Sequence, residues 1–298
     1  MILVTGASGS LGGMILSGLT QIDGLEVAGG TRHGDGVSAR RVDFDDARSL
    51  PAAFTGVDVL LVVSAGYAED DVIFARHGAV TDAAAAAGVR HVIYTSLASS
   101  GDSMTIAVPH RWTEDRLADG PFTTTILRNG LYTEVPVGLA MAGTAHITEP
   151  GVFAAPFGDG RVSVVAKEDL AEAAVRVAAE SERDLAAGRV SRHVGRVYEL
   201  EGETAVGGAD IAEILAETAA RPITYRPVTL AESRIGLTSS GLEPYQIGHA
   251  VSFFSNVIAE RAEATAGSDL PKLLRGPARP VRPAIAGALS TISAAAGA

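Results

Sequence analysis

Strand-like runs alternate with segments of helical periodicity along the first 130 residues of the chain. The strand-like runs occupy 2–4, 25–29, 41–44, 57–64, 91–95 and 123–127, and helical patterns follow at 11–22, 47–54, 70–87 and 110–118. The run 57–64 is almost continuously apolar, which is typical of a parallel strand covered on both faces. The alternation predicts an α/β fold built on a doubly wound parallel sheet. Its ligand would lie at the carboxyl ends of the strands, in the loops 6–12, 30–33, 64–67 and 96–109.

Beyond residue 130 the pattern is less regular. Strands are expected at 161–165, 197–200 and 223–225, and helices at 167–179, 210–219, 230–234 and 244–264. The polar stretch 182–192 predicts a loop, and the proline-rich segment 275–283 with its Ala/Gly-rich tail predicts a chain end lying over the surface. We therefore expect a nucleotide-binding domain at 1–130, and at 131–298 the remaining sheet strands with a smaller α/β substrate-binding part.

The first strand runs directly into a glycine-rich turn and a helix. Glycines without Cβ let a diphosphate approach the backbone, and the helix N-terminus offers unpaired N–H groups and partial positive charge. The spacing Gly-x-x-Gly-x-x-Gly is one residue longer than the commonest dinucleotide fingerprint, and a plain strand-to-helix turn is the alternative. The sequence predicts a Rossmann-type dinucleotide site whose turn residues are Thr5, Gly6, Ser8, Gly9, Ser10, Leu11 and Gly12.

The end of the second strand bears on the choice of cofactor. An acidic residue there would bind the ribose 2′-hydroxyl of NAD, but this end reads Gly30, Thr31, Arg32, His33. An arginine in that place favours a 2′-phosphate, so the pattern predicts NADPH, held by Thr31 and Arg32, with help available from Arg40 and Arg41. The alternative is that Arg32 is a solvated loop charge.

Composition excludes several classes of function. The chain of 298 residues has a net charge of −11 and no cysteine, and its seven histidines are scattered. We expect no nucleic-acid partner, because phosphates need basic surface, and no metal, because the histidine spacing does not suit zinc. No apolar run approaches a membrane span, so we expect no membrane association and a cytoplasmic location. No pattern in the sequence specifies an oligomeric state.

Several segments together resemble one family. They are 4–12, 42–44, 83–92, Tyr-Thr-Ser-Leu at 94–97, Leu-Arg-Asn-Gly-Leu-Tyr at 127–132 and 164–174. They resemble the NmrA-like, atypical branch of the short-chain dehydrogenase/reductase superfamily, in particular its NADPH:quinone reductase-like members. The resemblance implies that the adenine lies near Asp43 and Phe44, and the nicotinamide near Ser64, Ala65 and Gly66. It also places Asn129 and Tyr132 in the cofactor and substrate cleft. Asp43 could instead cap the following turn, and Tyr132 could be a core residue.

The chain departs from the superfamily's usual chemistry. Ordinary members reduce carbonyls with a Ser, a Tyr and a Lys four residues later, but no lysine here precedes Lys167. By the family pattern the Ser, Tyr and Lys positions fall on Leu97, Arg111 and Asp115, and the last two are spaced to form an ion pair on one helix face. The weaker candidates for donation to an oxyanion are Ser96, Ser99, His110, Thr113, Asn129 and Tyr132.

Four of these, Ser96, His110, Asn129 and Tyr132, are our candidate catalytic residues. His110 stands at an expected helix start; histidine is the commonest general acid near neutral pH, although a solvent-facing side chain is an equal alternative.

Two functions fit these observations. The first is an NADPH-dependent reductase of a small aromatic molecule, either a quinone or a polycyclic aromatic ketone. Such acceptors tolerate a weak proton donor, and the resemblance implies that the branch holds both quinone reductases and aromatic-polyketide ketoreductases. The second is a non-catalytic NAD(P)-binding redox sensor of the NmrA type, which would report cofactor state to a protein partner. A sugar-nucleotide epimerase or dehydratase is disfavoured, because those reactions use the absent Tyr and Lys.

Overall fold

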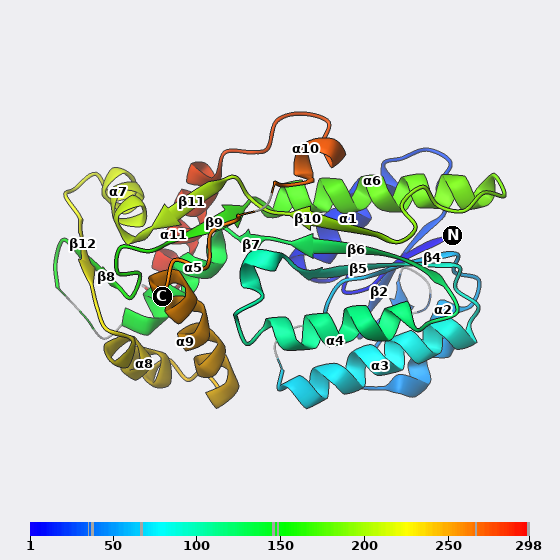
Figure 1. The fold of residues 1–298 in the computed structure, drawn as a ribbon, viewed down its shortest axis with the longest axis horizontal. Helices are drawn as coiled ribbons and strands as arrows, with labels where there is room; N and C mark the ends of the chain where they lie inside the picture. Colours follow the sequence, from blue (N-terminus) through cyan, green and yellow to red (C-terminus); the bar gives the residue numbers. More distant parts are fainter. Residues whose placement is uncertain are drawn as a thin grey trace.

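The computed structural model describes residues 1–34, 36, 39–65, 68–144, 147, 149–265 and 267–296. A parallel sheet forms the centre of its larger part (Figure 1). In spatial order the described strands of this sheet are β10 (Arg196–Leu200), β6 (Thr123–Asn129), β5 (His91–Leu97), β4 (Val59–Val62), β1 (Ile2–Val4), β2 (Val27–Thr31) and β3 (Arg40–Arg41). Every neighbouring pair is parallel, and Ile2 aligns with Val27 on one side and Val59 on the other. The expected doubly wound sheet is confirmed.

Helices cover both faces of this sheet (Figure 1). One face carries α1 (Ser10–Thr20) and α6 (Lys167–Ala186), with the short α10 (Leu270–Leu273) beside α6. The other carries α2 (Leu50–Phe54), α3 (Asp70–Ala86) and α4 (Ala107–Ala118), and single 3-10 turns lie at η1 (Ala47–Ser49) and η2 (Ser99–Gly101). Both faces are apolar: Ile15 and Val177 belong to the core on the α1/α6 side, and Leu60 and Val80 to the core on the α3 side.

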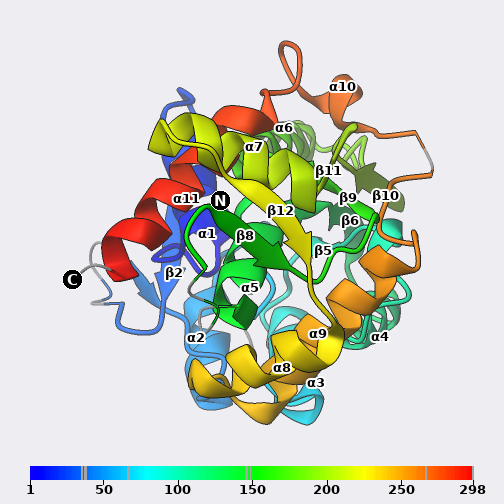
Figure 2. The same cartoon turned by 90° about the vertical axis from the view of Figure 1, so that its left-hand side faces the viewer.

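A smaller part lies beyond the carboxyl ends of the central strands (Figures 1 and 2). Its described strands form two sheets, β11-β9-β7 and β12-β8, from β7 (Leu131–Tyr132), β8 (Val152–Ala155), β9 (Arg161–Val165), β11 (Thr204–Gly207) and β12 (Thr224–Pro227). Around them pack α5 (Glu134–Thr144), α7 (Gly208–Ala219), α8 (Leu230–Ser239), α9 (Pro244–Ile258) and α11 (Val281–Ala296). The chain beyond residue 130 builds this part and also returns α6 and β10 to the larger one.

Two expectations about the second half of the chain are wrong in part, although residues 187–192 do lie outside the helix and residues 275–280 are exposed. Residues 182–186 continue α6, because the carboxylate of Asp184 is buried and paired with Arg189 and Arg192 instead of facing solvent. The tail does not lie loosely over the surface: α11 buries Val281, Ile285 and Leu289 at intervals of one helical turn in the core of the smaller part.

Two boundaries near the site also differ. The third strand is shorter than expected and ends at Arg41, so that Asp43 and Phe44 belong to the loop after it. Helix α4 begins at Ala107 and not at His110, which places His110 inside the first turn of the helix. None of the helices within the described ranges is long and apolar enough to cross a lipid bilayer.

Candidate functional site

The carboxyl ends of β1, β2, β4 and β5 meet at one edge of the sheet, because these strands are adjacent and parallel. The loops that follow them therefore lie together, as the sequence predicts. Two threonine hydroxyls fix this edge. Thr5 Oγ1 accepts a hydrogen bond from the Val63 N–H, and Thr95 Oγ1 accepts one from the Ser64 N–H, each at 3.0 Å. Thr5 thus ties the end of β1 to the end of β4.

The turn after β1 needs its glycines for geometric reasons. Gly6 has a φ of +61°, which favours glycine. A Cβ at Gly12 would lie 2.3 Å from the carbonyl oxygen of Gly6, so a larger residue would push α1 away from the turn. Ser8, Gly9 and Ser10 are exposed, and no side chain caps the N-terminus of α1. The turn therefore presents open backbone at a positive helix end.

The loops after β2 and β3 carry the charges expected near the adenosine end of a cofactor. Arg32 is exposed directly after Thr31, the last residue of β2. Arg40 donates to the carbonyl oxygens of Ala53 and Thr55, so its guanidinium is engaged at the end of α2. Asp43 Oδ1 accepts from the Asp45 N–H at 3.1 Å, which is the turn-capping contact given as the alternative for this residue.

A cavity of about 240 Å³ lies at the same sheet edge, between the two parts of the molecule. Its apolar walls include Val63, Ile73, Leu97, Ile106, Leu131 and Val135. Its polar lining includes Ser64, His77, Tyr94, Ser96, His110, Asn129, Tyr132 and His249. All four candidate catalytic residues therefore border one space, as does Ala65. Gly66 lies outside the described residues.

His77 of α3 holds the loop that follows β4. Its Nε2 accepts a 3.0 Å hydrogen bond from the Ala65 N–H, so the ring hydrogen is on Nδ1, which donates to Thr113 Oγ1 at 2.7 Å. The Thr113 hydroxyl in turn donates a hydrogen bond to the Pro109 carbonyl oxygen. Burial lowers the pKa of His77 to about 4, so the ring is neutral at pH 7. The Phe44 ring meets it edge-on, with centroids 6.4 Å apart.

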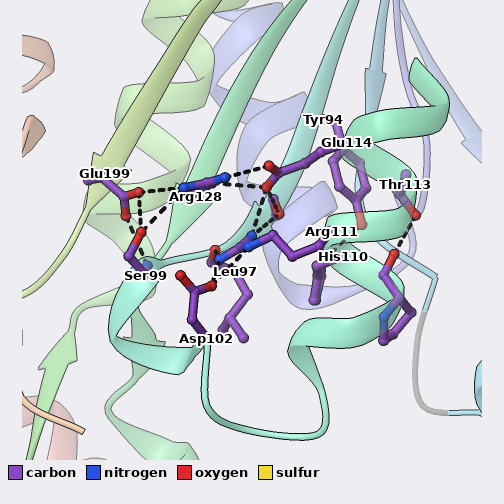
Figure 3. Close-up of polar contacts among 12 residues, drawn as sticks. Tyr94, Leu97, Ser99, Asp102, His110, Arg111, Thr113, Glu114, Arg128 and Glu199 are labelled. Atoms are coloured by element: carbon purple, nitrogen blue, oxygen red, sulfur yellow. Dashed lines mark hydrogen bonds and ion pairs between the residues drawn. The ribbon is translucent and has the colours of Figure 1, made fainter. Parts of the chain in front are cut away.

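Tyr94, which is fully buried, and His110, which is half-buried, form a second pair (Figure 3). Tyr94 Oη lies 2.9 Å from His110 Nδ1. Burial lowers the pKa of His110 to about 3 and raises the pKa of the Tyr94 hydroxyl above its usual range. At pH 7 both groups are therefore neutral. His110 borders the cavity, and its lowered pKa leaves the ring neutral at pH 7, a state that suits hydrogen-bond donation; its catalytic role stays a prediction.

Asn129 and Tyr132 lie where the central sheet passes into the smaller part. Asn129 is 5% exposed, and its Oδ1 is buried with no hydrogen-bond partner in the described part of the structure. Burial raises the pKa of Tyr132, and a hydrogen bond from Asn129 acts in the opposite direction. The Lys167 ammonium lies 5.2 Å from the centre of the Tyr132 ring. An unpartnered acceptor at the cavity suits a ligand that carries a hydrogen-bond donor.

Around Leu97 and Arg111, where the resemblance places the usual Ser and Tyr, this chain has an ion network (Figure 3). Glu114 accepts from Ser96, Arg111 and Arg128, and Arg128 also contacts Glu199 at 3.0 Å. Burial opposes ionisation of Glu114, but the bonds from Arg128 and Ser96 hold its pKa below its usual range. The Ser96 hydroxyl, 2.5 Å from Glu114 Oε1, is thus directed to that carboxylate.

The expected pair between Arg111 and Asp115 is wrong. The Arg111 guanidinium bonds Glu114 on the same helix, and Asp102 and the carbonyl oxygen of Leu97 earlier in the chain. The carboxylate of Glu114, whose side chain is 11% exposed, holds it there more strongly than an exposed i, i+4 partner could.

Sequence reasoning did not identify His77, Tyr94 or Lys167 as site residues. His77 carried a signal, because it interrupts the apolar face that Ile73, Val80 and Ala84 form on α3. Tyr94 belongs to the Tyr-Thr-Ser-Leu motif, but its place in a buried strand pointed to the core, and Lys167 reaches the site from a distant helix without any local signal. Among the described residues, no three histidine or acidic side chains come together as a metal site.

Comparison with known proteins gives consistent matches. The model of the NmrA-like family matches residues 1–232. Quinone oxidoreductase 2 of Escherichia coli is 33% identical over 252 residues, which covers 81% of this chain and 82% of the relative. An NAD(P)H azoreductase of Xenophilus azovorans is 26% identical over 94% of each chain.

Two solved structures share the whole arrangement. The NADPH complex of the Escherichia coli NADPH-dependent quinone oxidoreductase superposes with a TM-score of 0.80, at 29% identity over 96% of this chain and 99% of the other. The Citrobacter sp. triphenylmethane reductase complexed with NADP(H) also has a TM-score of 0.80, at 27% identity and the same two coverages.

Proposed function

The chain belongs to the NmrA-like family, and we propose that it is an NADPH-dependent reductase that transfers hydride to a quinone or another aromatic acceptor without a Ser, Tyr and Lys set. The observation that carries this function is the cavity, which opens at the same sheet edge as the glycine-rich turn and is walled by apolar and neutral polar side chains. Relatives named for quinones, azo compounds and triphenylmethane support an aromatic acceptor.

The residues at the sheet edge fit a dinucleotide. The turn at residues 5–12 is free of a side-chain cap and tolerates no Cβ at Gly12, so the backbone N–H groups of α1 are available to the diphosphate. Arg32 would bind the 2′-phosphate, and Asp43 and Phe44 would flank the adenine. Ser64 and Ala65 would border the nicotinamide. The orphaned Oδ1 of Asn129 would take a hydrogen bond from the cofactor or the acceptor. NADPH, when bound, supplies the hydride.

His110 is the proposed donor to the oxygen that becomes negative on the acceptor. When Tyr94 donates to Nδ1, the ring hydrogen of His110 is on Nε2 and is available to the cavity. A neutral donor in a water-poor site stabilises an oxyanion without giving up its proton. After hydride transfer the hydroquinone anion takes its proton from water. This is sufficient because the negative charge of that anion is delocalised over the ring. Ser96 is the weaker donor because its hydroxyl already bonds Glu114.

The test is oxidation of NADPH with a simple naphthoquinone and a hydroxyaryl ketone, with cofactor binding measured in the same sample. We expect turnover with at least one acceptor. The substitution His110→Phe should lower kcat about 100-fold and leave the NADPH Kd unchanged, because it removes one oxyanion donor. Tight NADPH binding without turnover on either acceptor would contradict the reductase and favour a redox sensor.

A further inference from the structure

Lys167 contacts two parts of the site, one of which, Ser10, lies 157 positions before it in the sequence. Its Nζ donates to Ser10 Oγ at 3.3 Å, at the first residue of α1, and lies 5.2 Å from the centre of the Tyr132 ring, which borders the cavity. The lysine thus stands between the glycine-rich turn and the place where an acceptor would bind.

Positive charge gathers at the start of α1. Lys167 begins α6, and its ammonium meets the uncapped first residue of α1, which has no acidic residue in its first turn. Glu134, whose side chain is 38% exposed, pairs with the ammonium, and Glu168 and Asp169 offset the positive end of α6. A phosphate at the start of α1 would therefore meet both a positive helix end and an ammonium.

We propose that Lys167 is a second cationic anchor for the cofactor, binding a phosphate oxygen on the nicotinamide side of the diphosphate. This inference rests on the proposed function, which places a dinucleotide at the turn. The lysine would compensate for the one that the Rossmann half lacks, although it comes from another helix and another part of the sequence. Arg32 would hold the adenosine end, and Lys167 the other end, of a strongly anionic ligand on a protein of net charge −11.

A purely structural role makes different predictions. If Lys167 served only to link α6 to Glu134 at the start of α5, removal of either partner would have the same effect. If Lys167 serves the cofactor, neutralising Glu134 should leave NADPH binding unchanged or tighter, because the lysine loses a competing anion. Neutralising Lys167 should weaken binding.

The experiment measures dissociation constants by isothermal titration calorimetry for wild type, Lys167→Met, Lys167→Arg and Glu134→Gln, with NADPH and with adenosine 2′,5′-bisphosphate. Methionine is an unbranched side chain of comparable length that removes the charge. For Lys167→Met we expect NADPH to bind about tenfold or more weakly, from the loss of one charge-assisted contact. The bisphosphate, which lacks the nicotinamide half, should bind as to wild type, and Lys167→Arg should restore most of the NADPH affinity.

Equal NADPH affinity in wild type and Lys167→Met would overturn the role of Lys167 and leave the proposed function intact. Equal losses of NADPH affinity in Lys167→Met and Glu134→Gln would show that the lysine is only a structural link. The same conclusion would follow if Lys167→Met weakened the binding of NADPH and of the bisphosphate equally. Absence of NADPH binding by wild type would overturn both the role of Lys167 and the proposed function.

Discussion

The backbone N–H of Ala65 donates a 3.0 Å hydrogen bond to Nε2 of His77, a residue twelve positions further along the chain on a different element. The loop after β4 is therefore positioned by a side chain of α3 and not by its own sequence. Because the other ring nitrogen faces Thr113 Oγ1, the ring is fixed in one tautomer.

The substitution His77→Phe should lower the free energy of unfolding by about 1–3 kcal/mol, because it keeps the ring volume but leaves the Ala65 N–H and Thr113 without their partner. Urea unfolding monitored by circular dichroism measures this. The matched change at an exposed histidine, His33→Phe, should have little effect. If the two variants lost the same stability, the bond from Ala65 would contribute nothing.

The free energy of unfolding should decrease as the pH is lowered from about 6.5 to about 4. Burial lowers the pKa of both His77 and His91 to about 4, below the ordinary 6.5. In this window the unfolded chain binds protons that the folded chain does not, so each histidine contributes a slope of up to about 1.4 kcal/mol per pH unit.

Urea unfolding at several pH values measures the slope. His91 contacts the hydroxyls of Thr123 and Thr125, and His91→Asn should reduce the proton uptake by about one. If the dependence of the unfolding free energy on pH were unchanged in His91→Asn, the proton uptake on unfolding would belong to other groups.

Arg32→Ala should weaken NADPH binding about 10- to 100-fold and NADH binding less than about twofold, since only NADPH carries a 2′-phosphate. Fluorescence titration of both cofactors measures this. Arg48→Ala is the control, because Arg48 is 98% exposed on the turn before α2. Equal losses for the two cofactors would place Arg32 away from the 2′-phosphate.

Two glycine-to-alanine changes should have opposite signs. At Gly12 a Cβ would lie 2.3 Å from the Gly6 carbonyl oxygen, so Gly12→Ala should destabilise the fold by about 1–3 kcal/mol. At Gly138, inside α5, a Cβ would meet nothing within 4 Å, so Gly138→Ala should stabilise by about 0.5–1 kcal/mol. Thermal and urea unfolding measure both, and a stabilising Gly12→Ala would contradict the close approach of helix and turn.

Glu114→Gln should lower the unfolding free energy by about 1.5–3 kcal/mol, because it removes the charge that Arg111 and Arg128 share. The control is Asp82→Asn, since Asp82 pairs with Arg116 while 69% exposed and should change stability by less than about 0.5 kcal/mol. Comparable losses in the two variants would show that burial of Glu114 does not strengthen its ion pairs.

The sequence by itself determined the fold, the family and the nucleotide turn. An almost continuously apolar run such as 57–64 is typical of a parallel strand covered on both faces, and a glycine-rich turn between a strand and a helix is typical of a dinucleotide site. The absence of any lysine before Lys167 also excluded the usual Tyr and Lys pair without a structure. These conclusions rest on local patterns, in which the informative residues are close in sequence.

Only the tertiary structure decided which side chains share the cavity and in what state. Ser96 lies within the Tyr-Thr-Ser-Leu motif, yet its hydroxyl bonds Glu114, and His110 is neutral because burial disfavours its charged form. His77, Tyr94 and Lys167 reach the sheet edge from separate elements. The spacing of residues within one segment does not predict which residues of other segments will lie beside them. The burial of a side chain and its contacts with distant residues depend on how helices and strands pack together. The hydrophobic periodicity and the composition of one segment do not specify that packing.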